Sequence, residues 1–190
     1  CSVAITMPSG TSTNPGGTGN QGGKFDYNSV DFNANMDIRN EIVRLTNEVR
    51  KESGVSELPT DSAMMNAAQA AAEWYAMRAS QTKHDRGAES ACVEKAGANY
   101  GVMTNLVKLG NDYGSDDAQK RANRAVTSWK NSSVHFQSMI DVTADNIGVG
   151  IAQDSNGNYW GVQFFGDYDS GSLWQSSALS SKMTPDEYLN

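Results

Sequence analysis

Apolar residues recur with a helical period in three stretches of the chain. In the first stretch, the spacing is four, three and four residues and predicts one apolar helix face, made of Ile38, Ile42, Leu45 and Val49. Asp37 before it is a suitable N-cap, and Ser53-Gly54 after it is a stop signal. We therefore expect a first helix from about Asp37 to Ser53.

A second helix is predicted after Pro59, with Thr60 or Asp61 as its N-cap. Its predicted apolar face is rich in alanine and consists of Met64, Ala68, Ala71, Tyr75 and Ala79. Because alanine side chains are short, another element can approach this helix closely. We therefore expect the second helix to be buried at the centre of the fold.

A third helix is predicted to begin at Ser115, because Asp116 and Asp117 suit the positive end of a helix dipole. Its apolar face consists of Ala118, Ala122, Ala125 and Trp129. A short helical segment then restarts at Ser133 and continues through Ile140.

The apolar period changes from helical to alternating in the last third of the chain. Ile147 to Ala152 alternates large and small residues, and Tyr159 to Phe165 is a second apolar run. Between them lies Ser155-Asn156-Gly157-Asn158, and Asn-Gly favours a tight hairpin turn. An antiparallel pair of strands that follows several helices indicates an α+β fold.

The pattern divides the chain into three parts. Residues 1–35 are expected to be an N-terminal extension, because Gly10–Gly23 lacks apolar periodicity, although Ser2–Met7 could form a short strand. Residues 36–166 form the predicted domain. Residues 167–190 are a polar C-terminal tail, with one helical turn predicted at Thr184–Glu187.

Composition and charge exclude two classes of protein. The chain has 190 residues with a formal net charge of −7, and its main basic cluster, Lys120, Arg121 and Arg124, follows two aspartates on a predicted helix. This cluster is interpreted as a solvated face, so nucleic acid is not an expected partner. No stretch approaches the ~20 apolar residues that a transmembrane helix requires.

Two cysteines, Cys1 and Cys92, favour a location outside the cytoplasm. Cys1-Ser2 followed by a Gly/Ser/Thr-rich stretch resembles the mature start of a bacterial lipoprotein, in which Cys1 would carry a lipid anchor. The alternatives are a processed or truncated end, or a disulfide with Cys92 that closes a loop of about 90 residues. No Cys-x-x-Cys zinc motif is present.

Several segments resemble a known family by their order and spacing. They are Leu45–Arg50 with Gly54 and Leu58, the alanine-rich Ala67–Glu73, His84, Ser128–His135, and the hairpin segments Ile147–Gly150 and Tyr159–Gly166. Over residues 36–166 the chain resembles a bacterial member of the CAP superfamily, the secreted cysteine-rich and pathogenesis-related proteins. The resemblance implies an exported three-layer α/β/α sandwich of the α+β class, with a central, mainly antiparallel sheet and a surface cleft.

In this family the cleft of the eukaryotic members holds two histidines and two glutamates, which can bind a divalent metal. His84 and His135 match the two histidines. The Glu-Asn pair of the family falls at Thr104-Asn105, so that the asparagine is kept and the glutamate is replaced. The second glutamate would follow Trp129, where no carboxylate is present. The resemblance therefore implies a cleft at His84, His135, Thr104 and Asn105 without its acidic partners.

Two imidazoles alone make an incomplete zinc site, because structural zinc takes four protein ligands and catalytic zinc usually three. Asp85, Glu89 and Glu94 follow His84 in a predicted loop, and one of them could supply a carboxylate. We expect at most loose binding of a divalent ion such as Zn²⁺ by His84 and His135. Asn105 is expected to hold the cleft loop through hydrogen bonds to the backbone.

No catalytic residue is assigned. The serines near His135 lack a Gly-x-Ser-x-Gly motif, Ser133 is better explained as a helix cap, and nothing near Cys92 marks it as an activated nucleophile. The sequence favours a non-catalytic exported domain that binds a small ligand or an extracellular or cell-wall partner. The alternatives are a metal-assisted hydrolase of peptides or cell-wall material, and a lipid or sterol carrier.

Overall fold

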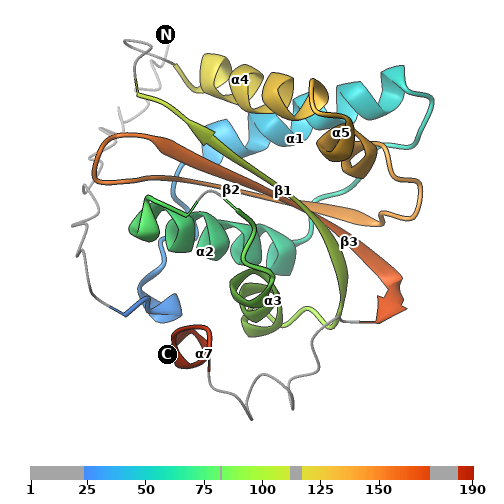
Figure 1. Ribbon diagram of the computed structural model, residues 1–190. Helices are drawn as coiled ribbons and strands as arrows, with labels where there is room; N and C mark the ends of the chain where they lie inside the picture. Colours follow the sequence, from blue (N-terminus) through green and yellow to red (C-terminus); the bar gives the residue numbers. More distant parts are fainter. Residues whose placement is uncertain (1–23, 82, 112–116, 172–183) are drawn as a thin grey trace, which may run out of the picture.

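The computed structural model describes residues 24–81, 83–111, 117–171 and 184–190. Its centre is one antiparallel sheet in the order β1-β3-β2, built from β1 (Tyr100–Leu109), β2 (Asn146–Gln153) and β3 (Tyr159–Gly171). Helices cover one face of this sheet: α1 (Met36–Glu52), α4 (Ala118–Lys130) and α5 (Ser133–Met139) (Figure 1). The other face is covered by α2 (Ser62–Arg78), with α3 (Arg86–Lys95) packed beside α2 and the last turn, α7 (Asp186–Leu189), packed against α3 (Figure 1). The predicted α/β/α sandwich is confirmed.

The second predicted helix is α2, and it is buried against β2 as its alanine content indicates. A β carbon at Gly150 would lie 2.0 Å from the carbonyl oxygen of Ala68, and one at Gly148 would lie 2.2 Å from that of Met64. Glycine in the strand and alanine in the helix therefore let the two backbones approach closely. The side-chain amide of Gln69 in α2 also donates to the carbonyl of Ile151 in β2 (3.1 Å) and accepts from its amide (3.0 Å).

Most predicted element ends agree with the structure. Asp61 caps α2 by accepting a hydrogen bond from the Met64 amide (2.9 Å). Asp117, rather than Ser115, caps α4, and Ser115 lies outside the described residues. The predicted hairpin is the β2–β3 pair, and Gly157 in its turn has a φ of +83°. The first helix begins one residue before Asp37, with Asn35 as its N-cap.

Two elements that contribute to the site were not predicted. Residues 86–95, expected to form a loop, are helix α3, and Tyr100–Leu109 is the edge strand β1. Helix α3 is only ten residues long and carries four charged residues, so its apolar period is faint. The burial pattern of β1 does not alternate regularly, because the successive polar residues Thr104 and Asn105, on opposite faces of the strand, are both buried.

Both predicted terminal segments pack into the core over the part that the structure describes. Phe25, Tyr27 and Val30 of the predicted extension are buried, and β3 continues past residue 166 to Gly171. The predicted turn is present as α7, with left-handed φ angles, and Leu189 is fully buried there. The Gly10–Gly23 linker, the Ser2–Met7 strand and the Cys1 anchor lie outside the described residues.

Cys92 is a free thiol on α3 and is fully buried. No helix in the described ranges has the length and apolar character needed to cross a bilayer.

Candidate functional site

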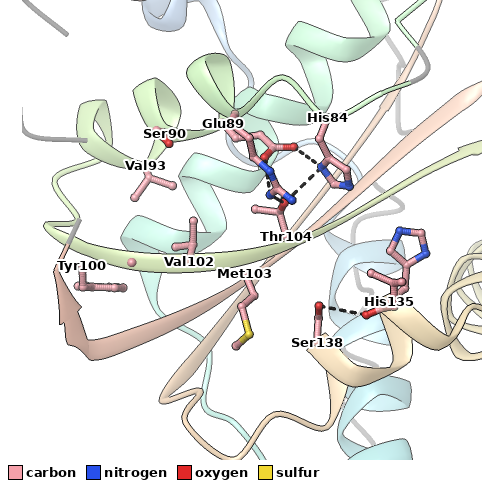
Figure 2. A pocket seen from close by; sticks show the side chains of 13 residues that line it. His84, Glu89, Ser90, Val93, Tyr100, Val102, Met103, Thr104, His135 and Ser138 are labelled. Atoms are coloured by element: carbon pink, nitrogen blue, oxygen red, sulfur yellow. Dashed lines mark hydrogen bonds and ion pairs between the residues drawn. The ribbon is translucent and has the colours of Figure 1, made fainter. Parts of the chain in front are cut away.

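A cavity of about 430 Å³ opens at the free edge of the sheet. Its floor is β1 from Tyr100 to Thr104. One wall comes from α3 and the loop before it, with His84 and Glu89, and the other comes from α5, with His135 and Ser138 (Figure 2). The cavity therefore spans both helical layers of the sandwich across the edge strand.

His84 is held by the carboxylate of Glu89, one of the three acidic residues that follow it in the sequence. Asp85 caps α3 by accepting a hydrogen bond from the Ala88 amide (3.0 Å), which starts the helix directly after His84. The first turns of α3 then bring Glu89 back toward the imidazole. Nδ1 of His84 lies 2.6 Å from Oε1 of Glu89 (Figure 2).

Glu89 is 1% exposed, and every side of its carboxylate is hydrogen-bonded. Oε1 accepts the hydroxyl of Tyr75 at 2.8 Å in addition to facing His84. Oε2 accepts the hydroxyl of Thr104 at 3.1 Å and the guanidinium of Arg86 at 3.1 Å. Because both oxygens of this buried carboxylate accept hydrogen bonds, Glu89 fixes the surrounding side chains.

Tyr75 connects this network to the central helix. Its hydroxyl accepts a hydrogen bond from the Asp85 amide (2.7 Å) while donating to Glu89. Burial, and then the nearby charge of Glu89, raise the pKa of Tyr75 well above its usual 10.0. Tyr75 therefore stays protonated and acts as a fixed link between α2 and the loop that carries His84.

Neither position that resembles a family glutamate carries a carboxylate, but Glu89, one of the three candidates that follow His84, supplies one from a different position. Thr104 occupies the position that resembles the family glutamate, and its hydroxyl bonds Glu89 and lies 3.2 Å from Nδ1 of His84. Because the residues after His84 were expected to form a loop, the sequence did not place Glu89 beside His84. Asp85 read as an N-cap would have predicted a helix with Glu89 in reach of His84.

His135 faces His84 across the cavity. The centroids of the two imidazole rings are 6.4 Å apart (Figure 2). Burial, and then the charge of His84, lower the pKa of His135 below its usual 6.5. The His135 ring is therefore neutral at pH 7 and offers both a donor and an acceptor nitrogen.

Asn105 does not line the cavity, although the resemblance includes it in the cleft. Its side chain is fully buried on the opposite face of β1, where Nδ2 donates to the carbonyl of His135 (3.0 Å) and to Oε1 of Gln163 (3.1 Å). Nε2 of Gln163 donates in turn to the hydroxyl of Thr46 in α1 (2.7 Å). This buried polar chain, Thr46–Gln163–Asn105, holds the backbone of α5 at His135.

The site does not fit a tightly held metal ion. Within the described ranges, no group of three His, Cys, Asp or Glu side chains could hold one. Both oxygens of Glu89 already accept hydrogen bonds from protein groups. Only His84 and His135 remain as ligands, which is fewer than zinc sites use.

The site also lacks the geometry of a hydrolytic triad. A triad requires a histidine that contacts an acid through one ring nitrogen and a nucleophile through the other. Here Glu89 and the Thr104 hydroxyl both contact the same nitrogen, Nδ1 of His84. Cys92 is not an alternative nucleophile, because burial raises the pKa of its thiol well above 9.0.

Residues 43–165 match the CAP family, described as the cysteine-rich secretory protein family. A cysteine-rich secretory protein from Staphylococcus aureus superposes with a TM-score of 0.54 at 20% identity over 71% of this chain and 40% of that chain. An outer surface protein from Borrelia burgdorferi superposes with a TM-score of 0.50 at 20% identity over 73% of this chain and 96% of that chain. An extracellular protein containing an SCP domain from Bacillus anthracis superposes with a TM-score of 0.50 at 17% identity over 67% of this chain and 40% of that chain.

This chain thus spans 40% of the length of the staphylococcal and Bacillus proteins. No curated protein matches it significantly. The structural likeness, at this identity, concerns the fold, and the sequence match covers well over half of the chain. On this evidence the chain belongs to the CAP family of cysteine-rich secretory proteins.

Proposed function

We propose that this chain is a non-catalytic binding domain that acts outside the cytoplasm. The cleft around His84 and His135 takes a polar group of a small ligand or of a partner protein. The location is supported by the family, which is secretory, and by structural relatives described as extracellular or outer surface proteins. A lipid anchor at Cys1 remains a prediction, and mass spectrometry of the native N-terminus tests it.

One observation carries the proposal. Glu89 and Thr104 occupy Nδ1 of His84, while Nε2 has no hydrogen-bond partner among residues 24–81, 83–111, 117–171 and 184–190. The ring of His135, 6.4 Å away, has no hydrogen-bond partner in the same part of the chain. Two positioned rings with unused polar atoms in an open cavity are suited to binding a polar group.

The alternative function, a metal-assisted hydrolase, requires a carboxylate close to the histidines, and Glu89 lies 2.6 Å from His84. The site lacks a placed nucleophile and a third metal ligand among the described residues, as shown above. The lipid or sterol carrier remains a prediction that no particular contact favours. The binding domain is therefore the best supported function.

Isothermal titration with zinc chloride separates the binding domain from the metal-assisted hydrolase. Wild type and the double variant His84→Ala/His135→Ala are compared. We expect no one-to-one zinc complex with a submicromolar Kd in either protein. Such a complex in wild type, lost in the double variant, would show that the cleft is a metal site instead.

Binding itself is tested by amide chemical shifts in NMR spectra during titration with N-acetyl amino-acid amides and simple sugars. We expect at least one probe to shift the resonances of His84, Thr104 and His135. The shifts should disappear in His84→Ala/His135→Ala and persist in Asn123→Ala, an exposed control on α4. If no probe shifts these resonances, the proposed function is wrong.

A further inference from the structure

The two edges of the sheet differ in how their backbone groups are used. On β2, the Ile151 amide donates to Oε1 of Gln69 (3.0 Å), and the Val149 carbonyl accepts from Nε of Arg39 (2.8 Å). Val149 and Ile151 therefore direct their backbone groups away from β3. Side chains of α1 and α2 satisfy these groups and close this edge.

The strand register determines which residues of β1 direct their backbone groups to the free edge of the sheet. Val149 is opposite Gln163, so the backbone groups of Gln163 point away from β2 and toward its other partner, Asn105. Successive residues of a strand direct their N–H and C=O groups to opposite sides. Val102 and Thr104 therefore direct theirs to the free edge of β1.

This free edge is the floor of the cavity. Val102 and Thr104 line it, together with Ser90 and Val93 on the α3 side and Val134 on the α5 side. In the part of the chain that the structure describes, no hydrogen-bond partner meets the backbone groups of Val102 and Thr104 on this edge. The cavity thus presents main-chain donors and acceptors between two walls of side chains.

Apart from the two histidines, the charged side chains that line the cavity are Arg86 and Glu89, and they pair with each other. The guanidinium of Arg86 lies 3.1 Å from the buried carboxylate of Glu89. The lowered pKa of His135 keeps its ring neutral at pH 7. The lining residues other than Arg86, Glu89 and His84 carry no charge: Ser90, Val93, Tyr100, Gly101, Val102, Met103, Thr104, Val134, His135 and Ser138. An uncharged ligand that both donates and accepts hydrogen bonds along a line is the best complement. A polypeptide backbone in extended conformation has this chemistry.

We propose that the ligand of the cleft is an extended, uncharged peptide segment of a partner protein. It adds to β1 as a fourth strand, with main-chain hydrogen bonds to Val102 and Thr104, and reaches the His84–His135 pair at one end. Strand addition to an open sheet edge is an established mode of peptide recognition. The inference rests on the proposed function, because it names the ligand of the same cleft.

The test begins with a random peptide library displayed on phage, selected on wild type and counter-selected on His84→Ala/His135→Ala. We expect enrichment of peptides with uncharged, alternating side chains. The enriched peptides are synthesised and N-methylated one amide at a time. In strand addition, every second amide faces β1, so methylation at alternate positions should weaken binding about tenfold or more. Equal effects at successive positions would overturn strand addition.

A protein variant gives a second measurement. Val102→Pro removes one edge-facing amide inside the cavity, and Leu106→Pro removes one on the same edge outside it. Proline is tolerated on an edge strand when its nitrogen faces outward. We expect Val102→Pro to weaken peptide binding about tenfold and Leu106→Pro to leave it unchanged, with folding checked by circular dichroism. The N-methyl series on wild-type protein remains decisive if either variant does not fold.

The outcomes separate this inference from the proposed function. If peptides shift the His135 resonances without a two-residue period in the N-methyl series, strand addition is wrong and the binding cleft stands. If no peptide is enriched while the small probes still shift His84 and His135, the peptide is the wrong ligand class. If neither peptides nor small probes act on these residues, both proposals are wrong.

Discussion

Nδ1 of His84 and Oε1 of Glu89 lie 2.6 Å apart, although one residue is in a loop and the other is in helix α3. This hydrogen bond orients the imidazole toward the cavity. It also joins His84 to a carboxylate that two hydroxyl groups and a guanidinium hold in place. The site is therefore organised around a buried, fully hydrogen-bonded carboxyl group.

Glu89→Gln should lower the free energy of unfolding by about 2 kcal/mol. The amide keeps the shape of the carboxylate, but its N–H₂ group would face donors such as Thr104 and Arg86. Urea unfolding followed by circular dichroism measures the change. The control is Glu52→Gln, whose parent side chain is 67% exposed and whose effect should stay within about 0.5 kcal/mol. Equal losses in the two variants would contradict the role of Glu89 in this network.

Asn105→Ala should destabilise the fold by about 2 kcal/mol, because it leaves the His135 carbonyl and Gln163 without their buried donor. It should also move the NMR resonances of His135, since α5 loses its tie to β1. Asn123→Ala, at an exposed position of α4, should do neither. Unchanged His135 resonances in a destabilised Asn105→Ala would limit Asn105 to a role in stability alone.

Stability should fall as the pH drops below 6.5, in part because of His135. Burial and the charge of His84 lower the pKa of His135 in the folded state below its usual 6.5. Between these two pKa values the unfolded chain binds more protons at this position, so acid favours unfolding. His135→Gln should make the free energy of unfolding less dependent on pH between 7.5 and 5.5. An unchanged slope would show that His135 does not contribute.

Gly150→Ala should destabilise the protein by about 3 kcal/mol or more, because its β carbon would overlap the carbonyl of Ala68 at 2.0 Å. The matched control is Gly97→Ala, where no atom lies within 4 Å of the new β carbon and only the φ of +92° opposes the change. The control should cost about 1 kcal/mol. Thermal unfolding measures both, and similar losses would contradict direct contact between α2 and β2.

Cys92 should not react with a thiol reagent in the folded protein, since its side chain is fully buried and burial raises its pKa. Labelling with iodoacetamide is followed by mass spectrometry, in the background Cys1→Ser. We expect modification in urea and none in buffer. Rapid labelling of the native protein would show that α3 opens readily.

The sequence predicted the parts of the fold that depend on local periodicity. The alanine-rich face of α2 indicated that another element approaches this helix closely, and the contact between Gly150 of β2 and Ala68 confirms it. Helix α3 and strand β1 escaped prediction because α3 is short and charged, and because β1 carries polar residues such as Thr104 and Asn105.

The sequence by itself determined helices α1, α2, α4 and α5, the hairpin and the family resemblance, because apolar period, caps and turn residues act over a few neighbouring positions. Only the tertiary structure decided that His135 faces His84, that Asn105 lies behind the cleft, and that Val102 faces an open edge. These relationships depend on how helices pack on the two faces of the sheet and on strand register. Side chains far apart in the chain meet according to that packing, which local patterns do not encode.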